Sequence, residues 1–153
     1  MSPVATALDI DTASRLRVAI GRLSRRLRTT AAGSAAGLTP TRISVLLTIV
    51  RDGPIRLSVL AEAESLNPTM LSRVIADLGD AGLVARVSDD GDRRAAWAEA
   101  TDKGRKLAER MRRERTDAVN EAMKQMAPAD RDLLEQALPA LEQLAEHLKD
   151  RRP

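Results

Sequence analysis

Residues 67–104 read NPTMLSRVIADLGDAGLVARVSDDGDRRAAWAEATDKG, and this stretch decides the fold. Asn67 lies directly before Pro68, which gives an N-cap residue followed by a proline at the first helical position, where the missing N–H is not needed. Apolar side chains then recur at three- and four-residue steps; they are Leu71, Val74, Ile75 and Leu78. This spacing predicts a helix over about 68–80 with one buried face.

The second half of the stretch predicts a β-hairpin followed by another helix. Residues 83–87 and 95–100 are strand candidates, and the polar, acidic loop 88–94 between them is exposed. Thr101 is placed to cap the next helix, and Gly104 allows that helix to pack closely beside the hairpin. Strand alternation gives the inward face of 95–100 only alanines, so we expect a hairpin with a thin core.

Shorter helices precede this stretch. Residues 56–63 form one of them, and a tight turn joins it to the helix over 68–80. Two short helices joined in this way, with a strand after the second, outline a helix-turn-helix. Upstream, a helix is expected over about 40–52, capped by Thr39. The small, glycine-punctuated residues 29–37 predict a loop.

Long amphipathic helices are expected at both ends of the chain. One covers residues 12–28, one runs for about 25 residues from Thr101, and the last covers about 129–149. Pro139 should kink or split the last helix, because its ring removes a helical hydrogen bond and clashes with the preceding turn. In a single chain the apolar stripes of such long helices would stay exposed to water, which leaves a dimer open.

The composition restricts the class of protein. A length of 153 residues fits one domain. The absence of cysteine excludes disulfide scaffolds, thiolate nucleophiles and cysteine-ligated zinc. Of the 25 basic residues, 21 are arginines, whose planar guanidinium suits phosphate and guanine edges. A GC-rich genome would explain the same bias, and the net charge of +3 is modest, so charge alone favours nucleic acid only weakly.

Neither a membrane protein nor an enzyme is expected. The longest apolar run, residues 43–50, is far shorter than the roughly 18–20 residues of a membrane span, and the N-terminus lacks a secretory signal, which predicts a cytoplasmic protein. His147, the only histidine, has no second ligand or base partner near it in the sequence. Carboxylates are scattered and no phosphate-binding glycine loop is present, so we expect no catalytic residue, no metal and no cofactor.

The order of these elements, together with one motif, resembles the MarR family of winged helix-turn-helix transcription regulators. The motif is Asp92-x-Arg94, six residues, then Thr101-x-x-Gly104, which matches the family's wing signature at every fixed position. The resemblance covers about residues 12–148. It implies a mainly α fold with a small β-hairpin wing, a winged helix-turn-helix with N- and C-terminal dimerisation helices.

The resemblance also implies how the chain is organised. A single domain is expected over residues 1–153, with a winged helix-turn-helix lobe at about 36–100 and dimerisation helices at about 12–30 and 101–150. These helices would interlock with those of a second copy, which gives a homodimer and covers the exposed apolar stripes. The residues expected at the dimer interface are Leu16, Ile20, Leu23, Leu138, Leu141 and Leu144.

By the same resemblance, the helix over 68–80 enters the major groove of double-stranded DNA at a pseudo-palindromic operator. The residues expected to contact DNA from this helix are Asn67, Pro68, Thr69, Ser72 and Arg73. They lie at the helix start or on its non-core side, where their donors can meet base edges and phosphates. Arg73 is the first choice for such a contact; the alternative is an ion pair with Asp77, one turn further on.

The wing residues have different expected roles, because adjacent residues of a strand point to opposite sides. By similarity, Arg93 enters the minor groove, whose negative potential attracts arginine. Arg94 pairs with Asp92 or reaches a phosphate. The residues expected to shape the wing and start the next helix are Asp92, Thr101 and Gly104. Two roles are open for Trp97, which either packs in the wing or faces DNA.

The resemblance implies a sequence-specific, homodimeric repressor whose DNA affinity is modulated by a small amphipathic or anionic effector. The chain has no phenylalanine or tyrosine, so an effector cleft would be lined by aliphatic side chains, with arginines from residues 15–28 at its rim. Nothing in the residues themselves demands a ligand. The alternative is a non-specific nucleoid or RNA-binding protein without an effector, although the acidic wing and the lack of stacking aromatics speak against it.

Overall fold

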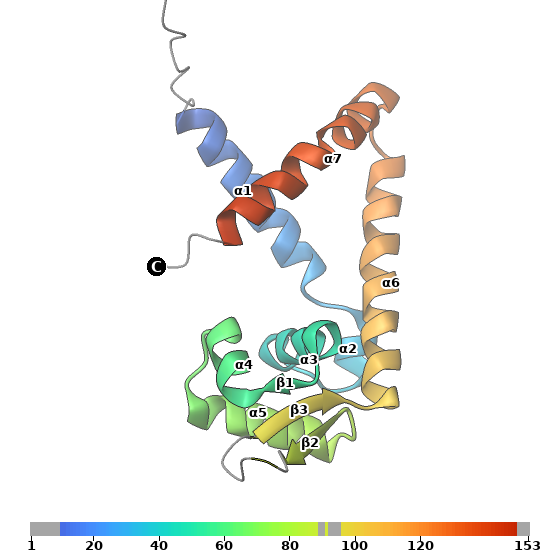
Figure 1. Cartoon of the computed structure of the whole chain (residues 1–153). Helices are drawn as coiled ribbons and strands as arrows, with labels where there is room; N and C mark the ends of the chain where they lie inside the picture. Colours follow the sequence, from blue (N-terminus) through green and yellow to red (C-terminus); the bar gives the residue numbers. More distant parts are fainter. Residues whose placement is uncertain (1–9, 89–90, 92–95, 150–153) are drawn as a thin grey trace, which may run out of the picture. The chain divides into compact units, whose positions relative to one another are not determined.

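Figure 1 shows the computed structural model of the chain, which describes residues 10–88, 91 and 96–149. The chain forms two compact units, Met1–Arg115 and Thr116–Pro153. Within the described residues, no helix is long and apolar enough to span a membrane.

The first unit combines helices with a small sheet (Figure 1). Its helices are α1 (Ile10–Leu27), α2 (Ala31–Ala35), α3 (Pro40–Asp52), α4 (Leu57–Glu64) and α5 (Pro68–Asp80). Its strands are β1 (Ile55–Arg56), β2 (Val84–Ser88) and β3 (Ala96–Ala100). The helix α6 (Asp102–Lys124) begins in this unit and ends in the second, which also contains α7 (Pro128–Lys149). The mainly α fold with a β-hairpin is confirmed.

The sheet is antiparallel, with the strand order β1-β3-β2. The sequence predicts the hairpin of β2 and β3 but not β1, because a strand of two residues is too short for alternation to show. In β1, Ile55 pairs with Ala98 and Arg56 pairs with Trp97. Ala98 and Ala100 are buried on the inward face of β3, so the thin alanine core expected of the hairpin is confirmed.

The helices α3 and α5 begin and end where the sequence predicts. Both use the residue before the proline as a cap: Thr39 Oγ1 accepts a hydrogen bond from the Arg42 N–H at 3.4 Å, and Asn67 Oδ1 accepts one from the Met70 N–H at 2.8 Å. Their apolar faces meet in the core of the first unit. The largest fully buried side chains are Val45, Leu46, Ile49, Leu60, Leu71, Leu78 and Met111.

The loop predicted over residues 29–37 is wrong for its central part, which forms α2. Two side chains cap this short helix. Thr30 Oγ1 accepts a hydrogen bond from the Gly33 N–H at 3.1 Å, and the Glu114 carboxylate of α6 accepts the Ala32 N–H at 3.1 and 3.2 Å. Tertiary capping therefore stabilises a helix that the small residues alone do not predict.

Pro139 does not split α7, which continues through it from residue 128 to residue 149. A proline removes one backbone hydrogen bond of a helix. The remaining hydrogen bonds of this 22-residue helix hold its two halves in one element. The expected split at this position is therefore wrong, and the kink stays a prediction.

The start of α6 is fixed on the turn between α5 and β2. We call residues 81–83 and 101–104 together the α5–α6 junction. Thr101 donates from Oγ1 to the Gly82 carbonyl at 2.7 Å and from its backbone N–H to the Leu83 carbonyl at 3.1 Å. Gly82 has a φ of 72°, which favours glycine. A Cβ on Gly104 would lie 2.1 Å from the Leu83 carbonyl oxygen, so no larger residue fits there.

We expect Gly104→Ala to destabilise the protein by about 2 kcal/mol or more, because the added methyl overlaps a backbone carbonyl that cannot rotate away. Gly79→Ala is the matched control, since a Cβ at this helical glycine meets nothing closer than 3.8 Å. The control should change stability by no more than about 1 kcal/mol. Urea unfolding of both variants measures the difference, and equal stabilities would contradict the close approach at Gly104.

Candidate nucleic-acid interface

The helix α5 presents a polar face at the surface of the first unit. Its buried side chains are Leu71, Val74, Ile75 and Leu78. Thr69, Ser72 and Arg73 are exposed on the other side of the helix, and Asn67 and Pro68 are exposed at its start. All five residues expected to contact DNA therefore lie on the surface, within the first two turns of one helix.

Asn67 caps the start of α5 with its side-chain carbonyl. Its Oδ1 accepts the Met70 N–H, so the carbonyl holds the helix start and the side-chain NH2 is the group left to donate outward. Pro68 occupies the first helical position and has no N–H of its own. Because the remaining N–H groups of the first turn point out of the helix end, this end is suited to an anion such as a phosphate.

The alternative ion pair of Arg73 with Asp77 is not observed. Asp77 instead accepts a short, charge-assisted hydrogen bond from Arg42 of α3, which joins α3 to α5. Arg73 forms no hydrogen bond or ion pair with any residue that the structure describes. The part of the chain that the structure describes therefore uses none of its guanidinium donors.

Hydrogen bonds at the α5–α6 junction also hold the base of the β2–β3 hairpin in place. Thr101 Oγ1 accepts the Gly104 N–H at 3.1 Å as the cap of α6. Arg105 donates to the Ala100 carbonyl at 2.6 Å and to the Asp102 carboxylate at 2.9 Å. The hydrogen bond from Arg105 lowers the pKa of the Asp102 carboxyl below its ordinary value. Thr101 and Gly104 thus lie at the base of the hairpin, where their contacts are with protein backbone.

The tip of the wing lies outside the described residues, and with it Asp92, Arg93 and Arg94. At the edge of the sheet, the Arg56 guanidinium carbon lies 5.1 Å from the centre of the Trp97 ring, a cation–π contact. Val87 of β2 is paired with Trp97 on the other side of β3. Of the two roles open for Trp97, the geometry favours packing in the wing.

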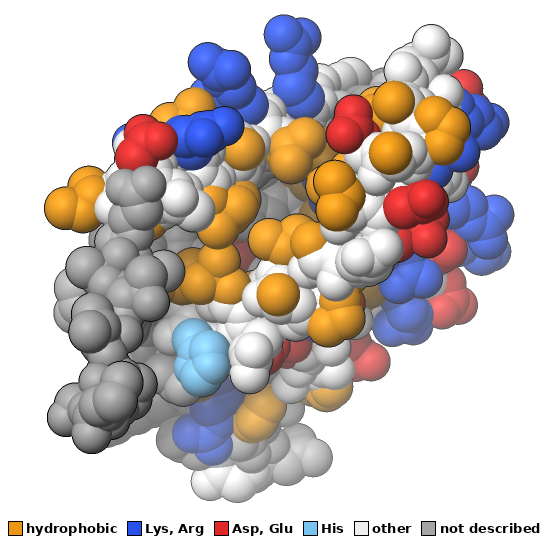
Figure 2. Space-filling model, turned by 90° about the horizontal axis from the view of Figure 1, so that it is seen from above, with side chains coloured by type: hydrophobic (Ala, Val, Ile, Leu, Met, Phe, Trp, Pro, Cys, Tyr) orange, Lys and Arg blue, Asp and Glu red, His pale blue; other side chains and the backbone are white. Residues whose placement is uncertain are grey.

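Long helices of the chain carry apolar side chains that the single chain leaves exposed. In α1 no residue is fully buried; Leu16 is half-buried, Ile20 is 45% exposed and Leu23 is 62% exposed. In α7, Leu138 is 51% exposed, and Leu141 and Leu144 are half-buried. Figure 2 shows hydrophobic side chains exposed among charged ones. Each helix therefore has an apolar stripe open to a partner.

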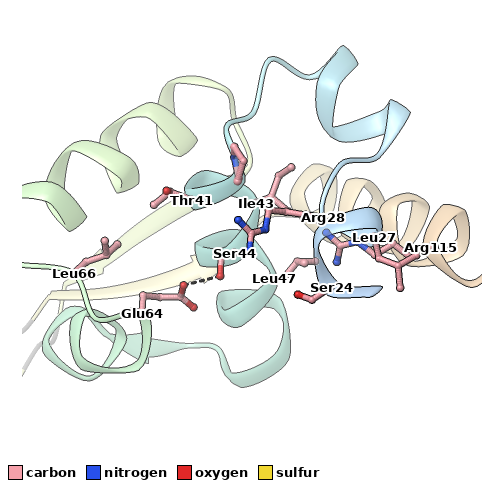
Figure 3. Close-up of a pocket in the computed structure, with 11 residues that line it drawn as sticks. Ser24, Leu27, Arg28, Thr41, Ile43, Ser44, Leu47, Glu64, Leu66 and Arg115 are labelled. Atoms are coloured by element: carbon pink, nitrogen blue, oxygen red, sulfur yellow. Dashed lines mark hydrogen bonds between the residues drawn. The ribbon is translucent and has the colours of Figure 1, made fainter. Parts of the chain in front are cut away.

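A cavity of about 540 Å³ lies between the end of α1, the start of α3 and Arg115 of α6, and we call it the α1–α3 cavity (Figure 3). Its residues are Ser24, Leu27, Arg28, Pro40, Thr41, Ile43, Ser44, Leu47, Glu64, Leu66 and Arg115. Glu64 is engaged within the protein, because its carboxylate accepts hydrogen bonds from Ser44 at 2.7 Å and from Thr48 at 2.5 Å. These bonds join the end of α4 to α3.

The sequence predicts only part of this cavity. The lining combines aliphatic side chains with the hydroxyls of Ser24, Thr41 and Ser44, which the sequence does not predict. Of the arginines in residues 15–28, only Arg28, directly after α1, is part of the lining. Arg115 and Glu64 are not predicted at all. Arg115 follows several other arginines of α6, so the sequence alone does not single it out. The structure shows that it lines this cavity and that the arginines before it in α6 do not. Its Nε is buried and has no hydrogen-bond partner among the described residues.

Comparison with known proteins agrees with this geometry. The model of the MarR family matches residues 38–96. The uncharacterized HTH-type transcriptional regulator Mb0904 of Mycobacterium bovis is 33% identical over 129 residues, which cover 84% of this chain and 89% of the relative. The crystal structure of RV1404 from Mycobacterium tuberculosis superposes with a TM-score of 0.77 at 24% identity, over 90% of this chain and 95% of that one.

A third similar protein is FabT of Streptococcus pneumoniae, whose crystal structure was solved in complex with DNA. It has a TM-score of 0.65 at 16% identity, over 89% of this chain and 99% of that one. At these low identities the two solved structures establish the fold. The relative with 33% identity extends the likeness to the sequence of nearly the whole chain. The chain, with its helix-turn-helix, its hairpin and its long flanking helices, belongs to the MarR family of helix-turn-helix transcriptional regulators.

Proposed function

We propose that the chain regulates transcription by binding a specific double-stranded DNA sequence through α5 and the wing. The observation that carries this proposal is the exposed Arg73, which no described residue engages, on a polar face that also holds Thr69 and Ser72. A guanidinium in a major groove donates two hydrogen bonds to a guanine edge or to a phosphate. FabT, which has this fold and was solved in complex with DNA, supports the proposal.

The active species is a homodimer. The exposed apolar stripes of α1 and α7 support this, because a second copy would remove them from water. A twofold dimer presents two copies of α5, so its operator is a pseudo-palindrome with half-sites about one helical turn, ~10 bp, apart. Such a dimer excludes other proteins from the DNA that it covers, and we therefore propose repression as its direction of control.

A small amphipathic anion in the α1–α3 cavity is the proposed effector. The cavity brings two guanidinium groups, from Arg28 and Arg115, to an otherwise aliphatic and hydroxyl-bearing lining. Its one carboxylate, Glu64, already accepts two hydrogen bonds, whereas the buried Arg115 Nε has no described partner. A carboxylate on an apolar body would satisfy the arginines and fill the aliphatic part of the cavity.

The first test compares DNA binding of Arg73→Ala and Arg93→Ala with that of the unchanged protein. Each should weaken binding to a selected operator by roughly 5- to 150-fold, about 1–3 kcal/mol, while the dimer stays intact. Arg113→Ala is the control, since this exposed arginine of α6 is held by Glu109 at 3.2 Å. Fluorescence anisotropy at fixed salt measures the affinities.

Unchanged affinity in Arg73→Ala would contradict the role of α5. Bulk DNA that competes as well as the operator, in the unchanged protein, would instead indicate a non-specific nucleic-acid-binding protein.

The dimer is tested by Leu138→Glu, which places a charge on the exposed stripe of α7. We expect the dimer to dissociate, because a carboxylate buried without a partner costs several kcal/mol, and DNA binding to weaken as a result. Gln136→Glu adds the same charge at an exposed position two residues away, off the stripe, and should leave the dimer intact. Sedimentation velocity gives both masses, and a dimeric Leu138→Glu at micromolar concentration would refute the interface.

The effector site is tested with octanoate, a carboxylate on an aliphatic chain. Calorimetry should show binding that the double variant Arg28→Gln/Arg115→Gln weakens by about tenfold or more. Arg25→Gln/Arg26→Gln removes the same charge from α1 positions outside the lining and should bind octanoate like the unchanged protein. Equal loss in both double variants, or in neither, would rule out the α1–α3 cavity as the anion site.

A further inference from the structure

A second cavity, of about 610 Å³, lies in the first unit between α2, the start of α6 and the turn after α5, and we call it the α2–α6 cavity. Three cationic side chains line it: Lys103, Lys106 and Arg110. They follow one another at three- and four-residue steps, so they stand on one face of α6. No acidic residue is part of this lining.

Most other cations of α6 are neutralised by acids of the same helix. Glu109 holds Arg112 at 3.0 Å and Arg113 at 3.2 Å, and Asp102 holds Arg105 at 2.9 Å. The cations of the α2–α6 cavity are not neutralised in this way. No described residue forms a hydrogen bond or ion pair with Lys106 or Arg110.

Lys103 has a partner, but a neutral one. Its Nζ donates to the Ala81 carbonyl at 2.7 Å, where it caps the C-terminal end of α5. The nearest acid in sequence, Asp102, is engaged by Arg105. Asp102 also attracts Lys106 electrostatically, but it forms no hydrogen bond or ion pair with it. The cavity therefore concentrates three positive charges, and no described acid pairs directly with Lys106 or Arg110.

The rest of the lining is apolar and small. It is made by Ala32, Ala35 and Ala36 from the α2 segment, Ala81 and Leu83 from the turn after α5, and Leu107. Small side chains leave room above them, and Glu114 holds this floor in place by capping the Ala32 N–H. A cavity lined by small apolar residues and a row of cations is suited to a compact molecule with one apolar and one charged side.

We propose that the α2–α6 cavity binds a small phosphate monoester or comparable dianion with an apolar body. Lys106 and Arg110, which no described acid holds in an ion pair, match the two charges of a phosphate monoester, and the alanines and leucines contact its apolar part. Free duplex DNA offers the same phosphate chemistry, but its backbone brings no apolar group to fill the floor. The site is separate from the α1–α3 cavity, with which it shares no lining residue.

The test is calorimetric titration of the full-length protein with phenyl phosphate and with inorganic phosphate. Phenyl phosphate should bind at one site per chain, and inorganic phosphate several-fold more weakly, because it lacks the apolar body. Lys106→Gln/Arg110→Gln should weaken phenyl phosphate binding by about tenfold or more. Arg112→Gln/Arg113→Gln removes the same charge from the same helix and should leave binding unchanged.

Two further variants distinguish the source of binding. Ala35→Glu puts a carboxylate at the exposed floor and should abolish phenyl phosphate binding without unfolding the protein, whereas Arg115→Gln in the other cavity should leave it intact. The proposal would be overturned if phenyl phosphate did not bind, or if Arg115→Gln abolished its binding. It would also be overturned if Lys106→Gln/Arg110→Gln and Arg112→Gln/Arg113→Gln weakened phenyl phosphate binding equally. A further contradicting result is an unchanged protein that does not bind phenyl phosphate and whose affinity for DNA falls in Lys106→Gln/Arg110→Gln. The two cations would then be contacts to DNA.

Discussion

The close approach of Gly104 to the Leu83 carbonyl is the constraint on which the rest of the first unit depends. It sets α6 against the turn between α5 and β2, and Thr101 secures the same contact with hydrogen bonds to Gly82 and Leu83. The end of α5, the start of the hairpin and the start of α6 therefore meet at one rigid point. The two elements proposed to touch DNA are α5, which ends at this point, and the hairpin, which begins there. The junction therefore fixes their relative positions.

Acidic side chains in the first unit are used to join elements to one another. Asp77 binds Arg42 between α5 and α3, Glu64 binds Ser44 between α4 and α3, and Glu114 caps α2 from α6. These acids are then unable to neutralise the arginines and lysines that face outward. As a consequence, positive charge without a described partner remains at three places: the polar face of α5, the α1–α3 cavity and the α2–α6 cavity.

The sequence predicts what is set by neighbouring residues. An N-cap residue before a proline locates α3 and α5 to the residue, and alternation locates the hairpin. The sequence does not predict contacts between side chains and residues that are far away in the chain. The caps of α2 include Glu114, 82 residues from Ala32, and the partner of Asp77 is 35 residues away. For the same reason the sequence does not show that Arg115 enters a cavity or that Arg73 stays unpaired.

In the proposed complex, two copies of α5 bind one pseudo-palindromic DNA site. Hydroxyl-radical footprinting of a genomic fragment selected by the protein tests it most directly. We expect two protected segments about one helical turn, ~10 bp, apart and related by twofold symmetry, with two chains bound per site. Protection that spreads evenly along any fragment, or a single protected segment with one chain bound, would contradict it.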